Sequence, residues 1–179
     1  MSDPNAPLGI FDSGVGGLTV LRRVAERMPA ESIVYLGDTA RVPYGTKSAD
    51  TVARYARSCA DVLMARGIKM LIVACNTASA YALETLRREL PVPVLGVIEP
   101  GAKRAVAVTR ADHIGVIGTA GTIASGKYQD TIREYAPGAR VSTKPCPLFV
   151  PLAEEGWVTG AVPEQVAHEY LTGLCRDGI

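Results

Sequence analysis

The chain has 179 residues, of which 47% are hydrophobic, so it is long enough to bury a sizeable core. Its 19 Lys and Arg residues balance 18 Asp and Glu residues, and this near-neutral charge, without any basic run, gives no indication of nucleic acid or an anionic membrane as a partner. The N-terminus lacks the pattern of a signal peptide and no apolar segment approaches the roughly 20 residues of a membrane helix, so we expect a soluble, cytoplasmic protein.

Short apolar runs alternate with longer amphipathic segments along the first half of the chain. The short runs predict strands at residues 8–11, 33–36, 70–74 and 94–97. Helical spacing of apolar residues predicts helices at 18–28, between the cap Ser48 and the stop Gly67, and at 77–90. The unbroken apolar run at 70–74 is typical of a strand that is buried on both faces of a sheet.

A similar series begins again in the second half. It predicts strands at 114–118 and 141–146 and helices at 122–135 and 163–175. Because strands and helices alternate, the sequence indicates an α/β fold with parallel sheets that are covered by helices on both faces. We place the boundary near Glu99, which gives a first α/β domain at 1–98 and a second at 99–179.

Polar residues gather where the predicted strands end. In open parallel sheets, ligands bind at the carboxyl ends of the strands, so these residues are candidates for a site. The residues that follow the strands are Asp12, Ser13, Asp38, Cys75, Asn76, Thr77 and Thr119. No lysine ends any of these four strands. The set suits a small polar zwitterion, with one thiol positioned for chemistry.

Cys75 is the central candidate because it closes a buried strand and directly precedes a predicted helix. The free N–H groups and dipole of a helix N-terminus favour the thiolate, and the same N–H groups can hold a substrate carboxylate. A packed core thiol is the alternative interpretation, and it is the commoner fate of a free cysteine. Position alone leaves both interpretations open.

The other cysteines and the histidines give no sign of a metal site. The four cysteines are widely spaced without a C-x-x-C pair, which predicts reduced thiols rather than a zinc site. Only His113 and His168 are present, so we predict no metal. Two glycine-rich stretches, at 14–17 and 115–121, could be taken for nucleotide turns, but neither has the spacing of a phosphate-binding motif. A nucleotide-binding module at 115–121 stays open as a second hypothesis.

Six stretches together resemble the glutamate racemase family. They are GIFDSGVGGLTV at 9–20, YLGDTARVPYG at 35–45, ACNTASA at 74–80, GVIEPG at 96–101, GVIGT at 115–119 and CPLFVPLAEEG at 146–156. The resemblance implies two pseudo-symmetric α/β domains with the active site between them. It also implies the conversion of L-glutamate to D-glutamate for peptidoglycan, without a cofactor or a metal.

Residue roles follow from the resemblance position by position. Cys75 corresponds to the first catalytic cysteine of the family, and Asp12, Asp38 and Glu154 correspond to acidic residues that assist the cysteines. Further residues correspond to substrate-binding positions: Asp12-Ser13, Tyr44-Gly45, Asn76-Thr77, Thr119 and Thr122. Glutamate is the expected small-molecule partner, and a homodimer stays open as the assembly.

The sequence departs from the family in its second thiol. The family carries a second catalytic cysteine in a Gly-Cys-Thr-His-Tyr-Pro motif on a later strand, and neither Cys146 nor Cys175 lies in such a motif. We therefore expect the second domain to be incomplete in this chain, and the 179 residues alone to racemise glutamate poorly. A catalytically incomplete protein that only binds a ligand or regulates is the alternative.

Thiols suit this reaction for a chemical reason. Racemisation without a cofactor needs a base on one face of the α-carbon and an acid on the other. A thiol with an ordinary pKa of about 8.5 can serve as thiolate on one side and as thiol on the other. Hydrogen-bond donors from Ser13, Asn76 and Thr77 would stabilise the charge that develops when the α-proton is removed.

Overall fold

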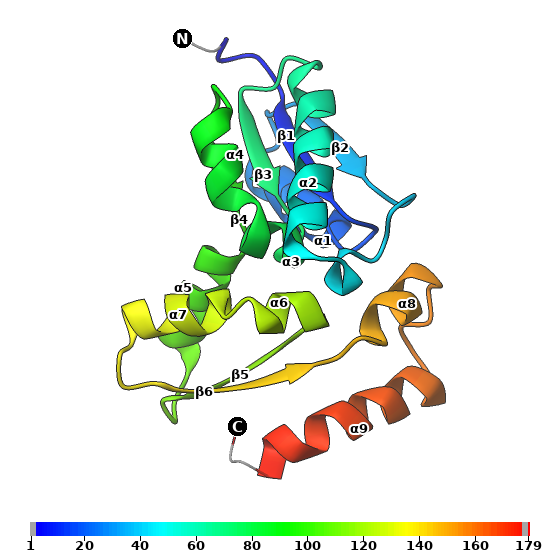
Figure 1. Ribbon diagram of the computed structural model, residues 1–179, viewed down its shortest axis with the longest axis vertical. Helices are drawn as coiled ribbons and strands as arrows, with labels where there is room; N and C mark the ends of the chain where they lie inside the picture. Colours follow the sequence, from blue (N-terminus) through cyan, green and yellow to red (C-terminus); the bar gives the residue numbers. More distant parts are fainter. Residues whose placement is uncertain (1–2, 177–178) are drawn as a thin grey trace. The chain divides into compact units, whose positions relative to one another are not determined.

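Strand β1 (Leu8–Asp12) is buried along its whole length, because it is an interior strand of a four-stranded parallel sheet. The computed structural model describes residues 3–176 and 179, and it divides into two units, Met1–Val97 and Ile98–Ile179 (Figure 1). Strand β1 belongs to the first unit, whose sheet has the order β2-β1-β3-β4. The residues outside this description are Met1, Ser2, Asp177 and Gly178.

The remaining elements of the first unit alternate between strands and helices. They are α1 (Leu18–Arg27), β2 (Ile33–Gly37), the 3-10 helix η1 (Tyr44–Thr46), α2 (Ala49–Met64), β3 (Met70–Val73), α3 (Asn76–Tyr81), α4 (Leu83–Glu89) and β4 (Val94–Gly96). All strand pairs of this sheet are parallel. The four predicted strands are therefore confirmed, each within one or two residues of its predicted ends.

The core of the first unit lies between this sheet and helix α2, which Figure 1 shows running along the sheet. Helix α2 begins at the predicted cap, where the Ser48 hydroxyl accepts a hydrogen bond from the Thr51 N–H at 3.3 Å. Apolar residues at helical spacing then face Phe11, Leu71 and Val73. These helix residues are Val52, Ala56, Cys59 and Leu63.

Two expectations about this unit differ from the structure. Strand β3 is not buried on both faces: Leu71 and Val73 are buried toward α2, whereas Met70 and Ile72 on the opposite face are half-buried. The predicted helix 77–90 consists of α3 and α4, which meet at Ala82. There φ widens to −115°, beyond the usual helical value, although the backbone hydrogen bonds continue on both sides.

The second unit is built around a parallel pair of strands. Its elements are α5 (Ile98–Val108), β5 (His113–Gly118), α6 (Ala120–Ala124), α7 (Lys127–Tyr135), β6 (Arg140–Pro145), α8 (Phe149–Glu154) and α9 (Ala161–Arg176). Its core joins β5 to α5 and α7 through Ala102, Ile114, Val116 and Ile132. The predicted helix 122–135 is divided because Gly126 takes a left-handed φ of +70°, which favours glycine.

Two helices of the second unit were not predicted, and each contains a proline. Pro100 is the third residue of α5 and Pro151 is the third residue of α8. Residues in the first turn of a helix donate no hydrogen bond within the helix, so a proline there, which lacks an N–H, removes none. Gly101 in α5 also has a structural role. A Cβ at this position would lie 3.2 Å from the Tyr128 hydroxyl, so the glycine lets α5 and α7 approach closely.

The predicted class is confirmed, since both units are α/β with parallel strands. Within residues 3–176, no helix combines the length and apolar character that crossing a bilayer requires.

Candidate active site

Three predicted residues lie at adjacent strand ends of the first sheet. Asp12 is the last residue of β1 and pairs in register with Gly37 of β2, so Asp38 follows immediately beside it. On the other side, the Ala74 N–H donates to the Phe11 carbonyl at 2.8 Å, which places Cys75 next to the end of β1. Parallel pairing therefore brings two carboxylates and a thiol to one edge of the sheet.

The Asp12 carboxylate is fixed by the turn that follows it. Its Oδ2 accepts hydrogen bonds from the Gly14 N–H at 3.1 Å and the Gly17 N–H at 2.9 Å, and the residue is 7% exposed. A Cβ on Gly17 would lie 2.4 Å from the Asp12 Cβ, which is too close for any side chain. The glycine-rich turn thus holds a carboxylate of the protein.

The Cys75 thiol lies between two polar groups. Its Sγ donates to the Ser13 hydroxyl at 3.4 Å and accepts from the Ala78 N–H, also at 3.4 Å. Cys75 is therefore the N-cap of α3, with extended φ and ψ angles, and it is 4% exposed. The predicted position at a strand end and helix start is confirmed.

The expected shift toward thiolate is wrong for this structure. Burial raises the pKa of the Cys75 thiol, and the nearby negative charge of Asp12 raises it further. The hydrogen bonds that Cys75 makes with the Ser13 hydroxyl and the Ala78 N–H lower this pKa, but by less. The helix start acts as predicted, yet removal from water outweighs it, so Cys75 favours the neutral thiol.

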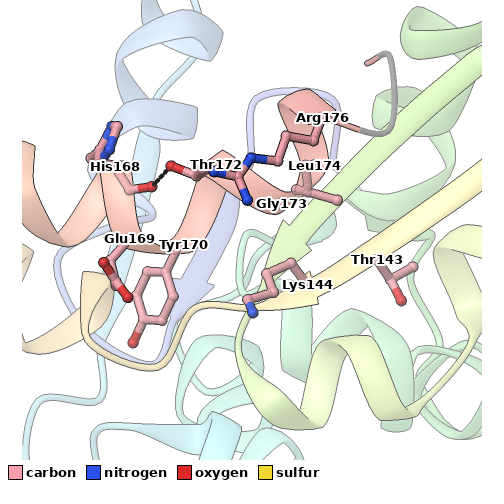
Figure 2. Close-up of a pocket in the computed structure, with 9 residues that line it drawn as sticks. All are labelled: Thr143, Lys144, His168, Glu169, Tyr170, Thr172, Gly173, Leu174 and Arg176. Atoms are coloured by element: carbon pink, nitrogen blue, oxygen red, sulfur yellow. Dashed lines mark hydrogen bonds between the residues drawn. The ribbon is translucent and has the colours of Figure 1, made fainter.

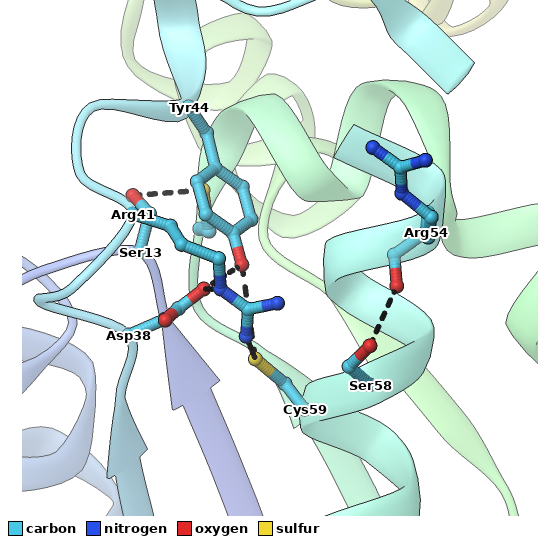
Figure 3. Close-up of polar contacts among 8 residues, drawn as sticks. Ser13, Asp38, Arg41, Tyr44, Arg54, Ser58 and Cys59 are labelled. Carbon is cyan, nitrogen blue, oxygen red and sulfur yellow. Dashed lines mark hydrogen bonds and ion pairs between the residues drawn. The ribbon is translucent and has the colours of Figure 1, made fainter. Parts of the chain in front are cut away.

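Asp38 and Tyr44 form a second polar cluster in the same unit (Figure 3). The Tyr44 hydroxyl donates to Asp38 Oδ2 at 2.5 Å, and Arg41 Nε lies 2.6 Å from the same oxygen. Cys59 Sγ is 3.7 Å from both the Tyr44 hydroxyl and the Arg41 guanidinium. Burial, and then the hydrogen bond to Asp38, raises the pKa of Tyr44.

The remaining predicted residues of the first unit surround these groups. Gly45 is buried as the second residue of η1, and η1 packs against α3. Asn76 and Thr77 are the first two residues of α3; Thr77 is buried and Asn76 is exposed. The pairs Tyr44-Gly45 and Asn76-Thr77 therefore belong to elements that contact each other.

The second unit holds three predicted residues. Thr119 caps α6 by accepting from the Thr122 N–H at 3.2 Å, and its hydroxyl donates to the Thr122 hydroxyl at 3.0 Å. Thr122 is buried, while Glu154 is the half-buried last residue of α8. The structure thus joins the two threonines, and the eleven predicted residues divide into eight in the first unit and three in the second.

Arg41, Cys59 and Gly17 are site neighbours that the sequence reasoning missed. Arg41 stands three positions after Asp38 inside the distinctive stretch 35–45, and that spacing was an available signal. Cys59 lies in the core at the helical spacing of the apolar residues of α2, but its sulfur also contacts the polar cluster. Its contact with Tyr44 depends on tertiary packing.

A separate polar cavity of about 630 Å³ lies in the second unit beside β6 and α9 (Figure 2). Lys144, His168 and Arg176 contribute to its lining, and none of the predicted site residues does. Lys144 lies next to the last residue of β6, a strand end that the sequence reasoning did not consider. Gly115 lies within β5, whereas Gly118 ends that strand and Gly121 lies in the first turn of α6, after the cap Thr119.

Comparison with known proteins gives a consistent result. Residues 12–172 match the family model described as Asp/Glu/Hydantoin racemase. The glutamate racemase of Geobacter metallireducens is 57% identical over 176 residues, covering 98% of this chain and 65% of that protein. The glutamate racemase of Aquifex aeolicus is 56% identical over 164 residues, covering 92% of this chain and 64% of that protein. The chain therefore spans about 65% of the length of these curated relatives.

Solved structures agree with the sequence relatives. Glutamate racemase from Francisella tularensis in complex with D-glutamate is 40% identical, with a TM-score of 0.90 over 98% of this chain and 66% of that one. The enzyme from Aquifex pyrophilus is 54% identical, with a TM-score of 0.81 over 94% of this chain and 66% of that one.

Proposed function

This chain belongs to the Asp/Glu/hydantoin racemase family, and we propose that it serves the cofactor-independent inversion of glutamate at its α-carbon, supplying D-glutamate for peptidoglycan. Relatives named glutamate racemase, at 50–57% identity, support the substrate, and so does the related structure solved with D-glutamate. We further propose that it acts in the cytoplasm and that a homodimer is the assembly to test by light scattering.

Cys75 is the acid–base group on one face of the α-carbon in this proposal. As thiolate, Sγ removes the α-proton of one enantiomer; as thiol, it returns a proton to the carbanion formed from the other. A raised pKa suits both roles, because a thiol of higher pKa is neutral before it donates and is a stronger base once deprotonated. The Ser13 hydroxyl and the Ala78 N–H stabilise the thiolate while it exists.

The opposite face needs a second proton donor, and we assign neither Cys146 nor Cys175 to it. Cys146 is buried directly after β6, where its thiol contacts the Lys144 carbonyl at 3.6 Å and burial raises its pKa. Cys175 is exposed on α9. We propose that a second thiol acts there, as the resemblance to the family implies.

The other predicted residues bind the substrate or assist the thiols in this proposal. Thr119 and Thr122 hold a carboxylate through their paired hydroxyls, and Asn76, Thr77 and Tyr44-Gly45 bind the remaining polar groups. Asp12 and Glu154 assist proton transfer, Asp12 by setting the charge beside the Cys75 thiol. Asp38 acts through its hydrogen bond with Tyr44.

The observation that carries the proposal is the Cys75 thiol at the strand edge, held by Ser13 and α3 beside the fixed Asp12 carboxylate. The test is to incubate a full-length form of the protein, which carries the second cysteine motif of the family, with L- and D-glutamate in deuterated water and to follow the α-proton by NMR. Exchange accompanied by inversion supports the proposal. Glutamate binding without exchange or inversion would instead support the alternative of a ligand-binding or regulatory protein.

A further inference from the structure

We propose that Arg41 is a positioning residue of the glutamate site: it fixes the Asp38 carboxylate and, through it, the hydroxyl of Tyr44. This inference rests on the proposed function, because Tyr44 and Gly45 are assigned there to substrate binding. Arg41 itself is not assigned a contact with the substrate. It acts on the site through the residues that it holds.

The geometry places two donors on one oxygen. Asp38 Oδ2 accepts from the Tyr44 hydroxyl at 2.5 Å and pairs with Arg41 Nε at 2.6 Å (Figure 3). The side chain of Asp38 is only 7% exposed, and Tyr44 is 1% exposed. A carboxylate so far removed from water is costly unless it is paired, so Arg41 provides the compensating positive charge beside the oxygen that accepts from Tyr44.

Arg41 is itself held in one orientation. Its guanidinium carbon lies 4.5 Å from the centre of the Tyr55 ring, a cation–π distance, and its Nη2 contacts Cys59 Sγ at 3.7 Å. The Arg41 N–H also donates to the Asp38 carbonyl at 3.1 Å. Only a planar guanidinium can pair with a carboxylate at one edge while it stacks on an aromatic ring, so lysine is a poor substitute.

The segment at residues 38–46 contacts the helix that carries the thiol site. Tyr44 begins η1, and η1 packs against α3, the helix that Cys75 caps. The Tyr44 ring in turn lies 5.6 Å from the ring of Tyr55, which carries Arg41 on its face. Loss of Arg41 should therefore loosen the Tyr44-Gly45 segment without removing any group assigned to proton transfer.

Arg54 is a matched control within the same cluster. Its guanidinium carbon lies 5.7 Å from the same Tyr55 ring, but it is exposed and makes no ion pair with Asp38. The experiment compares Arg41→Met, Arg41→Lys and Arg54→Met in the full-length form that carries the second cysteine motif of the family. It measures kcat and KM for both enantiomers, the melting temperature, and hydrogen–deuterium exchange of residues 38–46 by mass spectrometry.

For Arg41→Met we expect a KM about tenfold higher, the loss typical of one hydrogen bond to a charged group, with a smaller change in kcat and faster exchange at 38–46. Arg41→Lys should be intermediate, and Arg54→Met should match the parent. A purely structural role would lower the melting temperature of Arg41→Met while KM and exchange stay at parent values, and that result would overturn the proposal. Equal effects of Arg54→Met would overturn it too.

Two further outcomes are decided by the same measurements. If Arg41→Met does not fold, Arg41→Lys is used instead, and parent values of both KM and exchange in that variant overturn the positioning role. If the parent protein does not turn over glutamate, the proposed function fails, yet exchange at 38–46 still decides the role of Arg41. Unchanged exchange in Arg41→Met would then reject it.

Discussion

The Cys75 thiol and the Ser13 hydroxyl lie 3.4 Å apart, although each residue follows a different strand of the sheet. Parallel pairing of β1 with β3 places them side by side, and the cap of α3 holds the sulfur from the other side. The thiol is therefore held where two strands end and a helix begins.

In the full-length form, replacing Cys75 by alanine should remove racemisation in both directions, because in the proposed function one group serves as base for one enantiomer and as acid for the other. Loss of such general acid–base catalysis lowers the rate by on the order of 10²–10⁴-fold or more. Circular dichroism of glutamate solutions follows the inversion directly. The exposed thiol of Cys175 offers a control, since Cys175→Ala should keep parent activity. Near-parent turnover by Cys75→Ala would refute the assignment.

Replacing Asp12 by asparagine should lower the pKa of the Cys75 thiol. The negative charge of Asp12 disfavours the thiolate, so its removal shifts deprotonation to lower pH, while the asparagine carbonyl can still accept from the Gly14 and Gly17 N–H groups. The measurement is the pH dependence of alkylation of the peptide that contains Cys75, read by mass spectrometry.

Only the pH midpoint of that alkylation is compared, because the midpoint reports the pKa of the thiol, whereas the absolute rate also depends on how readily the reagent reaches the buried sulfur. The exposed Asp61 provides the control variant Asp61→Asn, which should keep the parent midpoint. A midpoint for Asp12→Asn that is unchanged or higher would contradict the electrostatic explanation.

Replacing Gly17 by alanine should destabilise the first unit. The added Cβ would lie 2.4 Å from the Asp12 Cβ, so the turn that holds this carboxylate must move, and overpacking of this kind costs about 1–3 kcal/mol. Urea denaturation measures the loss. Gly16→Ala is a close control, because its Cβ would meet Asp12 only at an ordinary 3.6 Å. Equal free energies of unfolding for the two variants would show that the turn adapts.

Replacing Thr119 by alanine should affect both stability and substrate binding. The cap of α6 is lost, which costs about 1 kcal/mol, and the hydroxyl pair with Thr122 is broken. Thr119→Ser keeps the hydroxyl and should restore both properties. If Thr119→Ala is less stable but has an unchanged KM for glutamate, its role is limited to capping the helix.

The sequence predicted the strands of the first unit well, because each contains a short apolar run, whereas β6 of the second unit has a mostly polar sequence. It predicted the helices less well where proline or glycine interrupts the pattern. Pro100 and Gly101 follow the boundary that we placed near Glu99, yet the proline lies in the first turn of α5 and the glycine accommodates Tyr128. Local sequence pattern cannot reveal the role of Gly101, since Gly101 and Tyr128 are brought together only by the packing of α5 on α7.

The position of Cys75 could also be predicted, but the direction of its pKa could not. Position depends on where a strand ends and a helix begins, and both are visible in the sequence. The pKa depends on how far burial removes the sulfur from water and on the charge of Asp12, which lies on another strand. Those quantities exist only in the folded sheet. The same holds for Arg41, whose spacing from Asp38 was visible but whose stacking on Tyr55 was not.

The pairing of β1 with β3 has a consequence for biosynthesis and handling. Ser13 and Cys75 are 62 positions apart in the chain, so their contact forms only after a non-local strand pairing, which is a slow class of folding event. Until then Cys75 is a solvent-accessible thiol with an ordinary pKa, whereas in the folded protein it is almost fully shielded. Oxidants should therefore damage the nascent or refolding chain at Cys75 far more readily than the finished protein, and a reductant is needed during refolding more than during storage.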